Sequence, residues 1–248
     1  MNKLELENVS KNFGGIHAIK DISMTVQPRE LVSIIGPSGC GKSTLLNMIS
    51  GLFEPDDGLI YLNGKVAKKR KGHVSYMIQK DLLLPWLKII DNVILSQKIK
   101  GESATLAKEK ARPLFKVFGL EGFEDKYPTQ LSGGMRQRAA LMRTYLDGKE
   151  ILLLDEPFSG LDALTKMKMQ DWLLNIKKTL DLTIVFVTHD IDEAIYLSNR
   201  IFVMSKRPAT IKAVKSVELR RPRQREMMES VKFLELKRYL VDLFEKEV

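Results

Sequence analysis

Apolar and polar residues alternate along the start of the chain, in the period-two pattern typical of half-buried strands. Residues 3–9 and 22–26 follow this pattern, and the glycine pair 14–15 between them indicates a turn. The run at 30–36 is almost continuously apolar, which is typical of a strand buried on both faces. The pattern therefore predicts an antiparallel β subdomain near the N-terminus, followed by a buried strand.

The middle of the chain has a helical period instead. From about residue 85 to 147 the strand signals disappear, and apolar residues recur at helical spacing in 104–118 and in 135–146. Two amphipathic stretches of this length are typical of helices that bury one face. We therefore expect an α-helical subdomain at about 85–147.

Strand signals return in the C-terminal part. Residues 150–154 and 183–187 are apolar runs separated by the amphipathic stretch 163–180, which predicts parallel βαβ units. In the last segment, about 226–247, apolar residues fall near one helical face and predict a docking helix. The expected architecture is a single α/β unit over residues 1–248 with a parallel sheet at its centre.

The composition agrees with a folded chain and excludes several other classes. With 248 residues, 44% of them apolar, the chain can bury a substantial core, and its single cysteine excludes a disulfide-stapled miniprotein. Its longest apolar runs have four residues, against roughly 18 for a membrane span. Acidic residues stand where a signal peptide needs an apolar stretch, so we expect the chain to stay in the cytosol.

The net charge of +9 comes from two short stretches. Residues 65–71 carry +5 and residues 206–225 carry +7, which leaves −3 for all other residues. Such concentration favours local basic patches on loops, either solvated or facing a membrane surface, over a groove that follows a nucleic-acid backbone. We therefore expect no nucleic-acid partner.

A glycine-rich segment at residues 36–43 fits the pattern G-x-x-x-x-G-K-[ST] and follows the buried strand directly. In this pattern backbone N–H groups surround phosphate oxygens, the lysine bridges the β- and γ-phosphates, and the hydroxyl binds Mg²⁺. The alternative is a plain glycine-rich turn. The phosphate-binding hypothesis covers Gly36, Pro37, Ser38, Gly39, Cys40, Gly41, Lys42, Ser43 and Thr44.

A pair of carboxylates forms a second candidate element. Asp155 and Glu156 follow the apolar run 151–154, so they are expected at the carboxyl edge of the parallel sheet. There Asp155 would orient a phosphate-bound Mg²⁺, and Glu156 would activate the attacking water as general base. An acidic pair after a strand also serves as a helix N-cap. The glycine loop favours the metal interpretation.

A third segment resembles a known family. Residues 131–138, Leu-Ser-Gly-Gly-Met-Arg-Gln-Arg, are similar to the signature motif of ATP-binding-cassette ATPases and lie 23 residues before Asp155, counted from Ser132. Alone, this segment would be a helix N-cap. Further positions match the cassette motifs in family order, namely Phe13 for the adenine-stacking aromatic, Gln79 for the Q-loop, Asp162 in the D-loop 159–162 and His189 for the switch histidine.

The resemblance implies a P-loop NTPase core and an ATP site shared by two chains that meet head to tail. One chain would supply Lys42, Asp155, Glu156, Gln79 and His189, and the other would supply Ser132 and Gly134. The resemblance also implies that Gly133 and Asp162 bind the nucleotide. Glu156, His189, Lys42 and Gln79 would be catalytic, with Mg²⁺ held by Ser43, Gln79 and Asp155. ATP binding would close the dimer and hydrolysis would reopen it.

The segment around Gln79 and Leu82–Trp86 places apolar residues on a loop. It is either a buried core segment or, as the resemblance favours, the groove that receives a transmembrane permease. The motifs look most like ATPases of importers for nitrate, sulfonates, taurine and thiamine-pyrimidine precursors. This implies a peripheral protein at the cytoplasmic face of the membrane, with a permease and an extracytoplasmic solute-binding protein as partners.

Other functions fit the sequence less well. Cassette ATPases of DNA repair or chromosome structure carry a long coiled coil between the glycine loop and the signature, and translation-type proteins carry two cassettes in one chain. Neither feature is present, although a non-transport cassette ATPase stays the alternative. A GTPase would need an Asn-Lys-x-Asp motif, which the sequence lacks.

Overall fold

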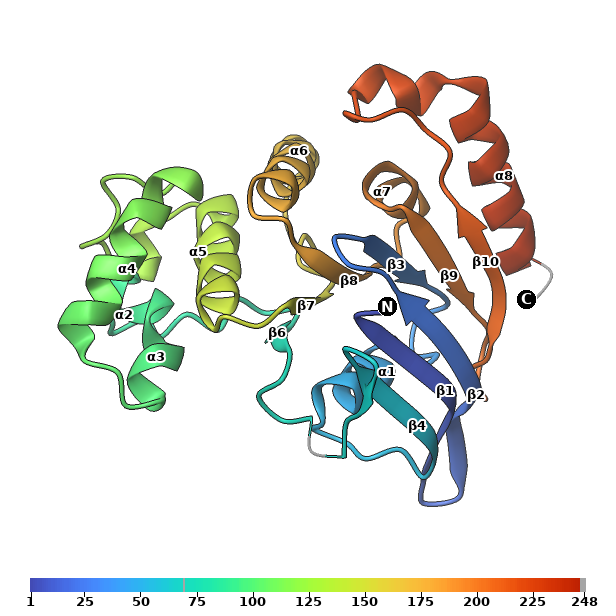
Figure 1. The fold of residues 1–248 in the computed structure, drawn as a ribbon. Coiled ribbons are helices and arrows are strands. Elements are labelled where there is room, and N and C mark those ends of the chain that lie inside the picture. The colour runs from blue at the N-terminus through green and yellow to red at the C-terminus, as the bar shows by residue number, and fades with distance from the viewer. Residues whose placement is uncertain (69, 246–248) are drawn as a thin grey trace.

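The computed structural model describes residues 1–68 and 70–245, and it has an α/β fold built on two sheets (Figure 1). Within these residues the central sheet has six strands in the order β10-β9-β3-β8-β7-β6. They are β3 (Leu31–Ile35), β6 (Ser75–Met77), β7 (Ile151–Asp155), β8 (Thr183–Val187), β9 (Arg200–Met204) and β10 (Ile211–Ser216). Neighbouring strands are parallel except at the β9–β10 pair. The expected parallel sheet is confirmed.

The strands β3, β7 and β8 are buried along their whole length, because both faces of the central sheet are covered. Leu153 and Val185 belong to the core shared with α1 (Lys42–Ser50) and the second sheet. Leu152 and Phe186 belong to the core shared with the helices of the opposite face. Since successive side chains point to opposite faces, a strand covered on both sides has a continuous apolar run.

The second sheet is antiparallel, as expected near the N-terminus. In the described residues it has four strands in the order β2-β1-β4-β5. They are β1 (Leu4–Phe13), β2 (Ile16–Val26), β4 (Asp57–Leu62) and β5 (Lys65–Val66). Gly14 and Gly15 form the turn between β1 and β2, with φ of 52° and 86° that glycine adopts without steric cost.

The helical region lies between β6 and β7 and stands to one side of the central sheet (Figure 1). It consists of α2 (Ile89–Val93), α3 (Leu95–Ile99), α4 (Ala104–Val117), the 3₁₀ turn η1 (Pro128–Gln130) and α5 (Gly133–Leu146). Phe115 and Phe118 are fully buried in its core. Residues 85–87 form a turn, so the helices begin at Ile89, later than the 85 expected from the pattern.

The C-terminal elements cover the same face of the central sheet as α5. They are α6 (Ala163–Thr179), α7 (Ile191–Leu197), the 3₁₀ turn η2 (Arg225–Glu229) and α8 (Val231–Glu245). Phe233 and Leu240 bury α8 against the core. The expected helix at 226–247 is thus divided at Ser230, and its last two residues lie outside the described ones. In the described part of the chain, no helix is both long and apolar enough for a membrane crossing.

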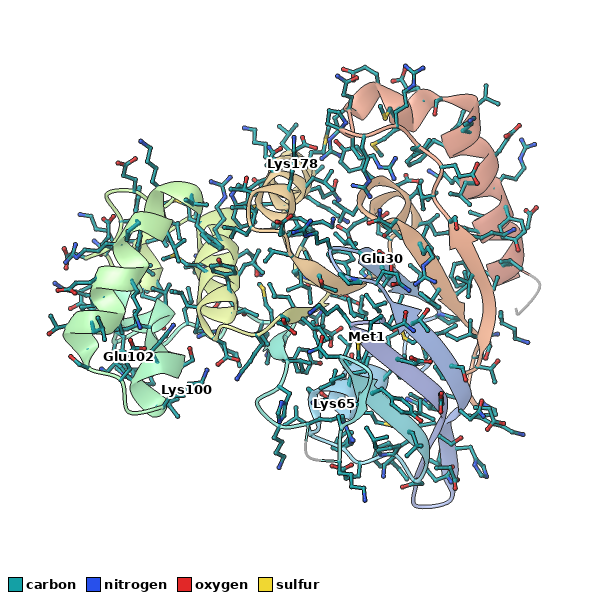
Figure 2. All side chains as sticks on the ribbon, viewed as in Figure 1. Met1, Glu30, Lys65, Lys100, Glu102 and Lys178 are labelled. Carbon is teal, nitrogen blue, oxygen red and sulfur yellow. The ribbon has the colours of Figure 1, made fainter. Side chains whose placement is uncertain are left out.

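The prediction that both basic stretches are loops holds only in part, because each stretch contains a strand. Lys65, seen at the surface in Figure 2, belongs to β5, and residues 211–216 form β10. Lysines at 212 and 215 hid the strand signal of β10, whose residues alternate between half-buried and exposed. Arg70 is not a surface charge either, because its guanidinium is 3% exposed and donates to the carbonyls of Met48 and Ala67 at 2.9 and 2.7 Å. Lys69 lies outside the described residues.

Candidate active site

The turn between β3 and α1 has a backbone that requires its glycines. Gly39 and Gly41 have φ of 71° and 125°, which side chains larger than hydrogen disfavour. At Gly36 a Cβ atom would lie 3.0 Å from the carbonyl oxygen of Met204 on the neighbouring β9. The glycines therefore let the loop turn tightly between the end of a strand and the start of a helix.

Lys42 occupies the centre of this loop. Its side chain is buried, and Nζ donates to the carbonyl oxygens of Gly36 at 2.8 Å and Pro37 at 2.9 Å. A buried ammonium group needs acceptors on its N–H bonds. The loop supplies them from its own backbone, which fixes the lysine where phosphate oxygens can replace the carbonyls.

A cavity of about 550 Å³ opens beside the loop. Its volume is in the range of small-molecule sites, about 300–1,000 Å³. Its walls are Ser38, Gly39, Gly41, Lys42, Ser43, Thr44, Gln79, Glu156, His189 and Arg207. All but Arg207 are residues that the sequence predicted for the site, and they come from the glycine loop, from the segment after β6 and from the ends of β7 and β8.

Glu156 is held from two sides at the carboxyl end of β7. Nδ1 of His189 lies 3.1 Å from its Oε2, and Nε2 of Gln79 donates to the same oxygen at 3.3 Å. The φ of Glu156 is 45°, in the left-handed region that is unfavourable for a residue of this kind. The surrounding contacts impose this conformation, and they direct the carboxylate into the cavity.

Asp155 lies next to Glu156 but is buried. Tyr76 donates its hydroxyl hydrogen to Oδ2 of Asp155 at 3.3 Å. Burial raises the pKa of the Asp155 carboxyl, and hydrogen bonds from the Ser43 and Tyr76 hydroxyls oppose that increase. Burial, followed by the charge of Asp155, raises the pKa of Tyr76 above its usual range. Asp155 is therefore a desolvated carboxylate beside the hydroxyl that ends the glycine loop.

Ser43 and Asp155 offer the oxygen donors that Mg²⁺ prefers, and Gln79 can add an amide oxygen. Among the described residues, no group of three or more His, Cys, Asp or Glu side chains could enclose a metal ion alone. A metal at Ser43 and Asp155 thus needs further oxygen ligands, and phosphate oxygens in the adjacent cavity would provide them. The residues present fit a phosphate-bound Mg²⁺.

The signature and D-loop residues do not line this cavity. Ser132 caps α5 by accepting from the backbone N–H of Met135 at 3.3 Å, and Asp162 caps α6 by accepting from that of Thr165 at 3.0 Å. A Cβ added to Gly134 would lie 3.0 Å from Thr165 Cγ2, so the two segments pack closely. Gly133 lies similarly close to Leu161, so the signature glycines pack on the D-loop and the start of α6, and none of Ser132, Gly133, Gly134 and Asp162 lines the cavity around Lys42.

Phe13 is another predicted residue outside the cavity. It ends β1 and is 41% exposed, and its ring meets that of Phe53 edge to face at 5.4 Å. Pro37 and Cys40 line a smaller hollow of about 360 Å³ beside the glycine loop. Burial raises the pKa of the Cys40 thiol, while Lys42 opposes the increase.

Two residues of the site were missed in the sequence. Arg207 lines both the main cavity and the smaller hollow, and Tyr76 contacts Asp155. Arg207 is the second residue of the basic stretch 206–225, and no motif connects it to the glycine loop. Tyr76 lies in the strand before Gln79, where an aromatic residue gives no signal of its own.

Known proteins are similar to this chain in both sequence and fold. The family described as ABC transporter matches residues 19–159. The uncharacterized ABC transporter ATP-binding protein MJ0412 of Methanocaldococcus jannaschii is 42% identical, over 99% of this chain and 92% of its own length. The aliphatic sulfonates import ATP-binding protein SsuB of Bacillus cereus is 40% identical, over 95% of this chain and 92% of its own.

Solved structures of ABC transporter cassettes have the same fold as this chain. The bacterial ABC transporter cassette MJ0796, in its dimeric structure, is 31% identical and superposes with a TM-score of 0.74 over 88% of this chain and 100% of its own. A second dimeric structure of that cassette represents a post-hydrolysis state bound to ADP and Pi and gives a TM-score of 0.73. Family match, relatives and fold agree with the cavity built around Lys42 and Glu156. The chain therefore belongs to the ABC transporter family and is one of its ATP-hydrolysing cassettes.

Proposed function

We propose that this chain is the ATPase subunit of an importer for a small solute, with sulfonates as the leading class and nitrate, taurine and thiamine-pyrimidine precursors as related ones. The observation that carries the proposal is the meeting of Lys42, Glu156 and His189 at one cavity, in a chain 40% identical to a sulfonate-import ATP-binding protein. The solute itself contacts the partners of this subunit.

The glycine loop binds the phosphates of ATP. Lys42 exchanges its two carbonyl acceptors for β- and γ-phosphate oxygens, and the backbone N–H groups of residues 36–43 surround the β-phosphate. Phe13, which is partly exposed, stacks on the adenine ring. The loop thus provides both charge and orientation for the reacting γ-phosphate.

Glu156 acts as the general base. It accepts a proton from a water molecule, the resulting hydroxide attacks the γ-phosphorus, and the bond to the β–γ bridging oxygen breaks to release ADP. His189 and Gln79 hold the carboxylate through contacts of 3.1 and 3.3 Å to the same oxygen. Because both also line the cavity, they connect the state of the γ-phosphate to the position of the base.

Ser43, Asp155 and Gln79 are the residues that would hold Mg²⁺. When bound, the ion neutralises charge on the phosphate oxygens during phosphoryl transfer. The buried Asp155 carboxylate favours this role, because desolvation strengthens its attraction for a cation. The Tyr76 hydroxyl fixes its orientation.

A second copy of the chain completes the site. Residues 1–248 act as one nucleotide-binding unit, with Ser132, Gly133, Gly134 and Asp162 directed to the ATP of the partner copy. The first backbone N–H groups of α5 have no acceptor within the helix, which suits a γ-phosphate. The dimeric structures of the cassette MJ0796 support this arrangement. ATP binding closes the dimer, and hydrolysis reopens it.

The subunit works at the cytoplasmic face of a membrane as a peripheral protein. Its permease contact is the segment that follows Gln79, where Leu82 and Trp86 are 53% and 70% exposed. These exposed apolar side chains, four residues apart in the chain, are available to a partner. The complete importer includes an extracytoplasmic solute-binding protein.

The test is the substitution Glu156→Gln. It removes the proton acceptor and keeps the shape of the side chain, so we expect ATP binding within about threefold of wild type and turnover lowered by a factor of about 10² or more. Because the closed state can no longer hydrolyse ATP, the variant should elute as a dimer in ATP and as a smaller species without it. Light scattering after size-exclusion chromatography measures this mass.

Glu109→Gln is the matched control, since Glu109 is exposed on α4, outside the cavity. It should hydrolyse ATP at the wild-type rate and form no trapped dimer. Hydrolysis by Glu156→Gln at a rate close to wild type would remove Glu156 as the base and refute the proposed mechanism.

A further inference from the structure

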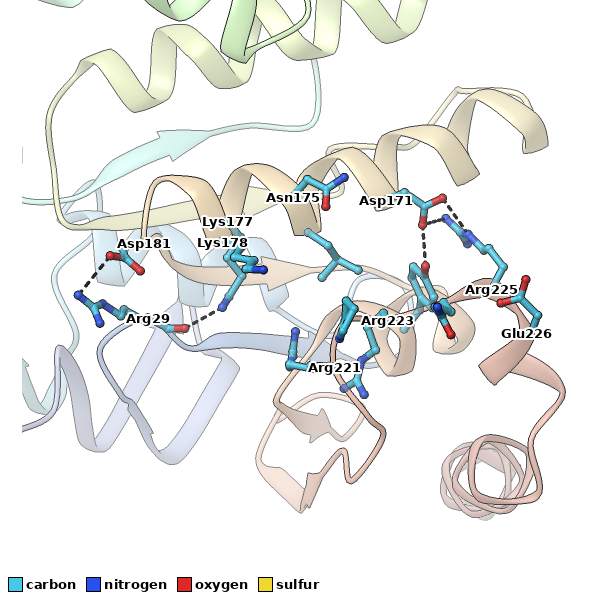
Figure 3. Close-up of a pocket in the computed structure, with 14 residues that line it drawn as sticks. Arg29, Asp171, Asn175, Lys177, Lys178, Asp181, Arg221, Arg223, Arg225 and Glu226 are labelled. Carbon is cyan, nitrogen blue, oxygen red and sulfur yellow. Dashed lines mark hydrogen bonds and ion pairs between the residues drawn. The ribbon is translucent and has the colours of Figure 1, made fainter.

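A separate cavity, of about 690 Å³, lies between α6, α7 and the segment 221–226 (Figure 3). It shares no residue with the phosphate cavity. Its far wall includes Arg29, whose backbone N–H donates to Thr183 Oγ1 at the start of β8 at 2.9 Å. The pocket is therefore at the amino edge of the parallel strands, whereas the glycine loop, Glu156 and His189 are at their carboxyl edge.

The pocket has a surplus of positive charge. Six cationic and three acidic residues line it. Arg29 pairs with Asp181 at 3.2 Å and Arg225 with Asp171 at 2.9 Å, so these four residues neutralise each other. The remaining cations have no acidic partner within 4.0 Å among the described residues, and they are Lys177, Lys178, Arg221 and Arg223. Glu226, the third acidic residue, has no ion pair with them, and six cations against three acids leave the pocket wall a net charge of +3.

Three of these cations, Lys177, Arg221 and Arg223, are held by backbone carbonyl groups. Lys177 Nζ donates to the carbonyl oxygen of Arg29 at 2.8 Å, and Arg221 and Arg223 donate to that of Ser198 at 3.2 and 3.0 Å. Ser198 ends α7, so the two arginines satisfy a free helix carbonyl. A carbonyl oxygen fixes the position of a guanidinium but cancels none of its charge. The structural contacts therefore leave the excess charge in place.

Arg223 is the most buried of these cations and shows most clearly that burying their charge is unfavourable. Its side chain is 8% exposed, and its Nε is buried without a hydrogen-bond partner in the described residues. Burial and then the nearby Arg221 lower the pKa of Arg223 to about 10. The pKa of Lys177 is also lowered, first by burial and then by Arg221. Arg221 thus disfavours the positive charge of both Arg223 and Lys177, although Glu30 and Asp181 partly offset its effect on the pKa of Lys177, and a bound anion would relieve this repulsion.

We propose that this pocket binds a soluble small molecule that carries a phosphate group. Figure 3 shows Lys177 on the α6 side of the pocket and Arg221 and Arg223 on the other side. Guanidinium groups bind phosphate through paired N–H bonds, and an ammonium adds a point charge. Leu174 and Pro222 provide apolar wall for the remainder of the ligand, and the volume suits a molecule of metabolite size.

The test uses pyrophosphate as the probe, titrated by calorimetry into the full chain saturated with ADP, so that the phosphate cavity is occupied. We expect one equivalent to bind per chain. The double variant Lys177→Met/Arg221→Gln should weaken binding at least tenfold. The control Lys116→Met/Arg112→Gln removes the same charges from exposed positions on α4. Its affinity for pyrophosphate should stay within twofold of wild type.

Arg223 is left unchanged in these variants because its buried guanidinium holds a helix end. If the double variant melts well below wild type, Lys178→Glu replaces it, since Lys178 is exposed on α6 (Figure 2) and its reversal should weaken binding severalfold. Absence of heat with the wild-type chain, or equal affinity in the pocket and control variants, would overturn the proposal. Succinate binding as tight as that of pyrophosphate would refute the preference for phosphate.

Discussion

Arg207 adds a positive charge to the phosphate cavity that no sequence motif contains. It is exposed and reaches the glycine loop, with a guanidinium nitrogen 3.9 Å from the position of a Cβ on Gly39. We predict that Arg207→Ala weakens ATP binding about fivefold, because an exposed cation near phosphate contributes about 1 kcal/mol. Calorimetric titration with ATP measures the change. Arg112→Ala, which removes an exposed arginine from α4, should bind ATP as wild type does, and an unchanged affinity in Arg207→Ala would exclude a phosphate contact.

Arg70, unlike Arg207, is a buried cation that stabilises the fold. Its guanidinium connects the carbonyls of Met48 and Ala67 to the Glu54 carboxylate, which accepts at 2.6 Å. Arg70→Ala removes a buried donor from these acceptors, of which the Met48 carbonyl keeps only the bond from the backbone N–H of Gly51 at 3.1 Å, so we predict a loss of about 3 kcal/mol in the free energy of unfolding. Urea denaturation measures this loss. Lys71→Ala removes the same charge from the exposed neighbouring position and should change the stability by less than about 0.5 kcal/mol.

Among the elements, the pairing of β1 with β4 depends on one glycine. Gly58 has φ of 85°, and a Cβ there would lie 2.4 Å from the carbonyl oxygen of Glu7 and 2.5 Å from that of Asn8. Backbone atoms of a paired strand cannot move aside cheaply. We therefore predict that Gly58→Ala lowers the free energy of unfolding by about 3 kcal/mol, from the clash and the unfavourable φ together.

Gly101 separates these two causes. It has the same φ of 85° and no atom within 4 Å of an added Cβ, so Gly101→Ala meets the unfavourable φ alone. This substitution should lower the free energy of unfolding by about 1 kcal/mol. Equal losses in the two variants, measured by thermal or urea unfolding, would show that the contact with β1 adds nothing.

The elements also show what a sequence can and cannot predict. The strand at 183–187 and the helix at 163–180 were predicted to within one residue, because each has one clear period. β10 was missed because its lysines interrupt the apolar pattern, and α7 because it has only seven residues. The motifs predicted that Gln79, Glu156 and His189 meet. Arg207 could not be predicted, because only the pairing of β9 with β3 brings the segment after β9 beside the glycine loop.

For the whole molecule, the segment after β6 joins the phosphate cavity to the outer surface. Gln79 contacts Glu156, and a few residues later the chain is fixed by Arg143, which donates to the carbonyl oxygen of Leu82 at 2.7 Å. Asn92 accepts from the backbone N–H of Leu84 at 2.7 Å and donates to its carbonyl oxygen at 3.1 Å. Trp86, 70% exposed, is therefore presented on a well-held turn rather than on a loose loop.

We predict that Trp86→Glu separates ATP hydrolysis from the permease. A tryptophan at the centre of an interface contributes about 2 kcal/mol or more, and a buried charge opposes binding, so the transmembrane subunits that co-purify with the wild-type chain should be recovered at least thirtyfold less. The rate of ATP hydrolysis by the isolated variant should stay within twofold of the wild-type rate, since Trp86 does not line the phosphate cavity. Ile99→Glu is the matched control, because Ile99 is 78% exposed in the same helical region. Undiminished recovery with Trp86→Glu, or an equal loss with Ile99→Glu, would place the permease contact elsewhere.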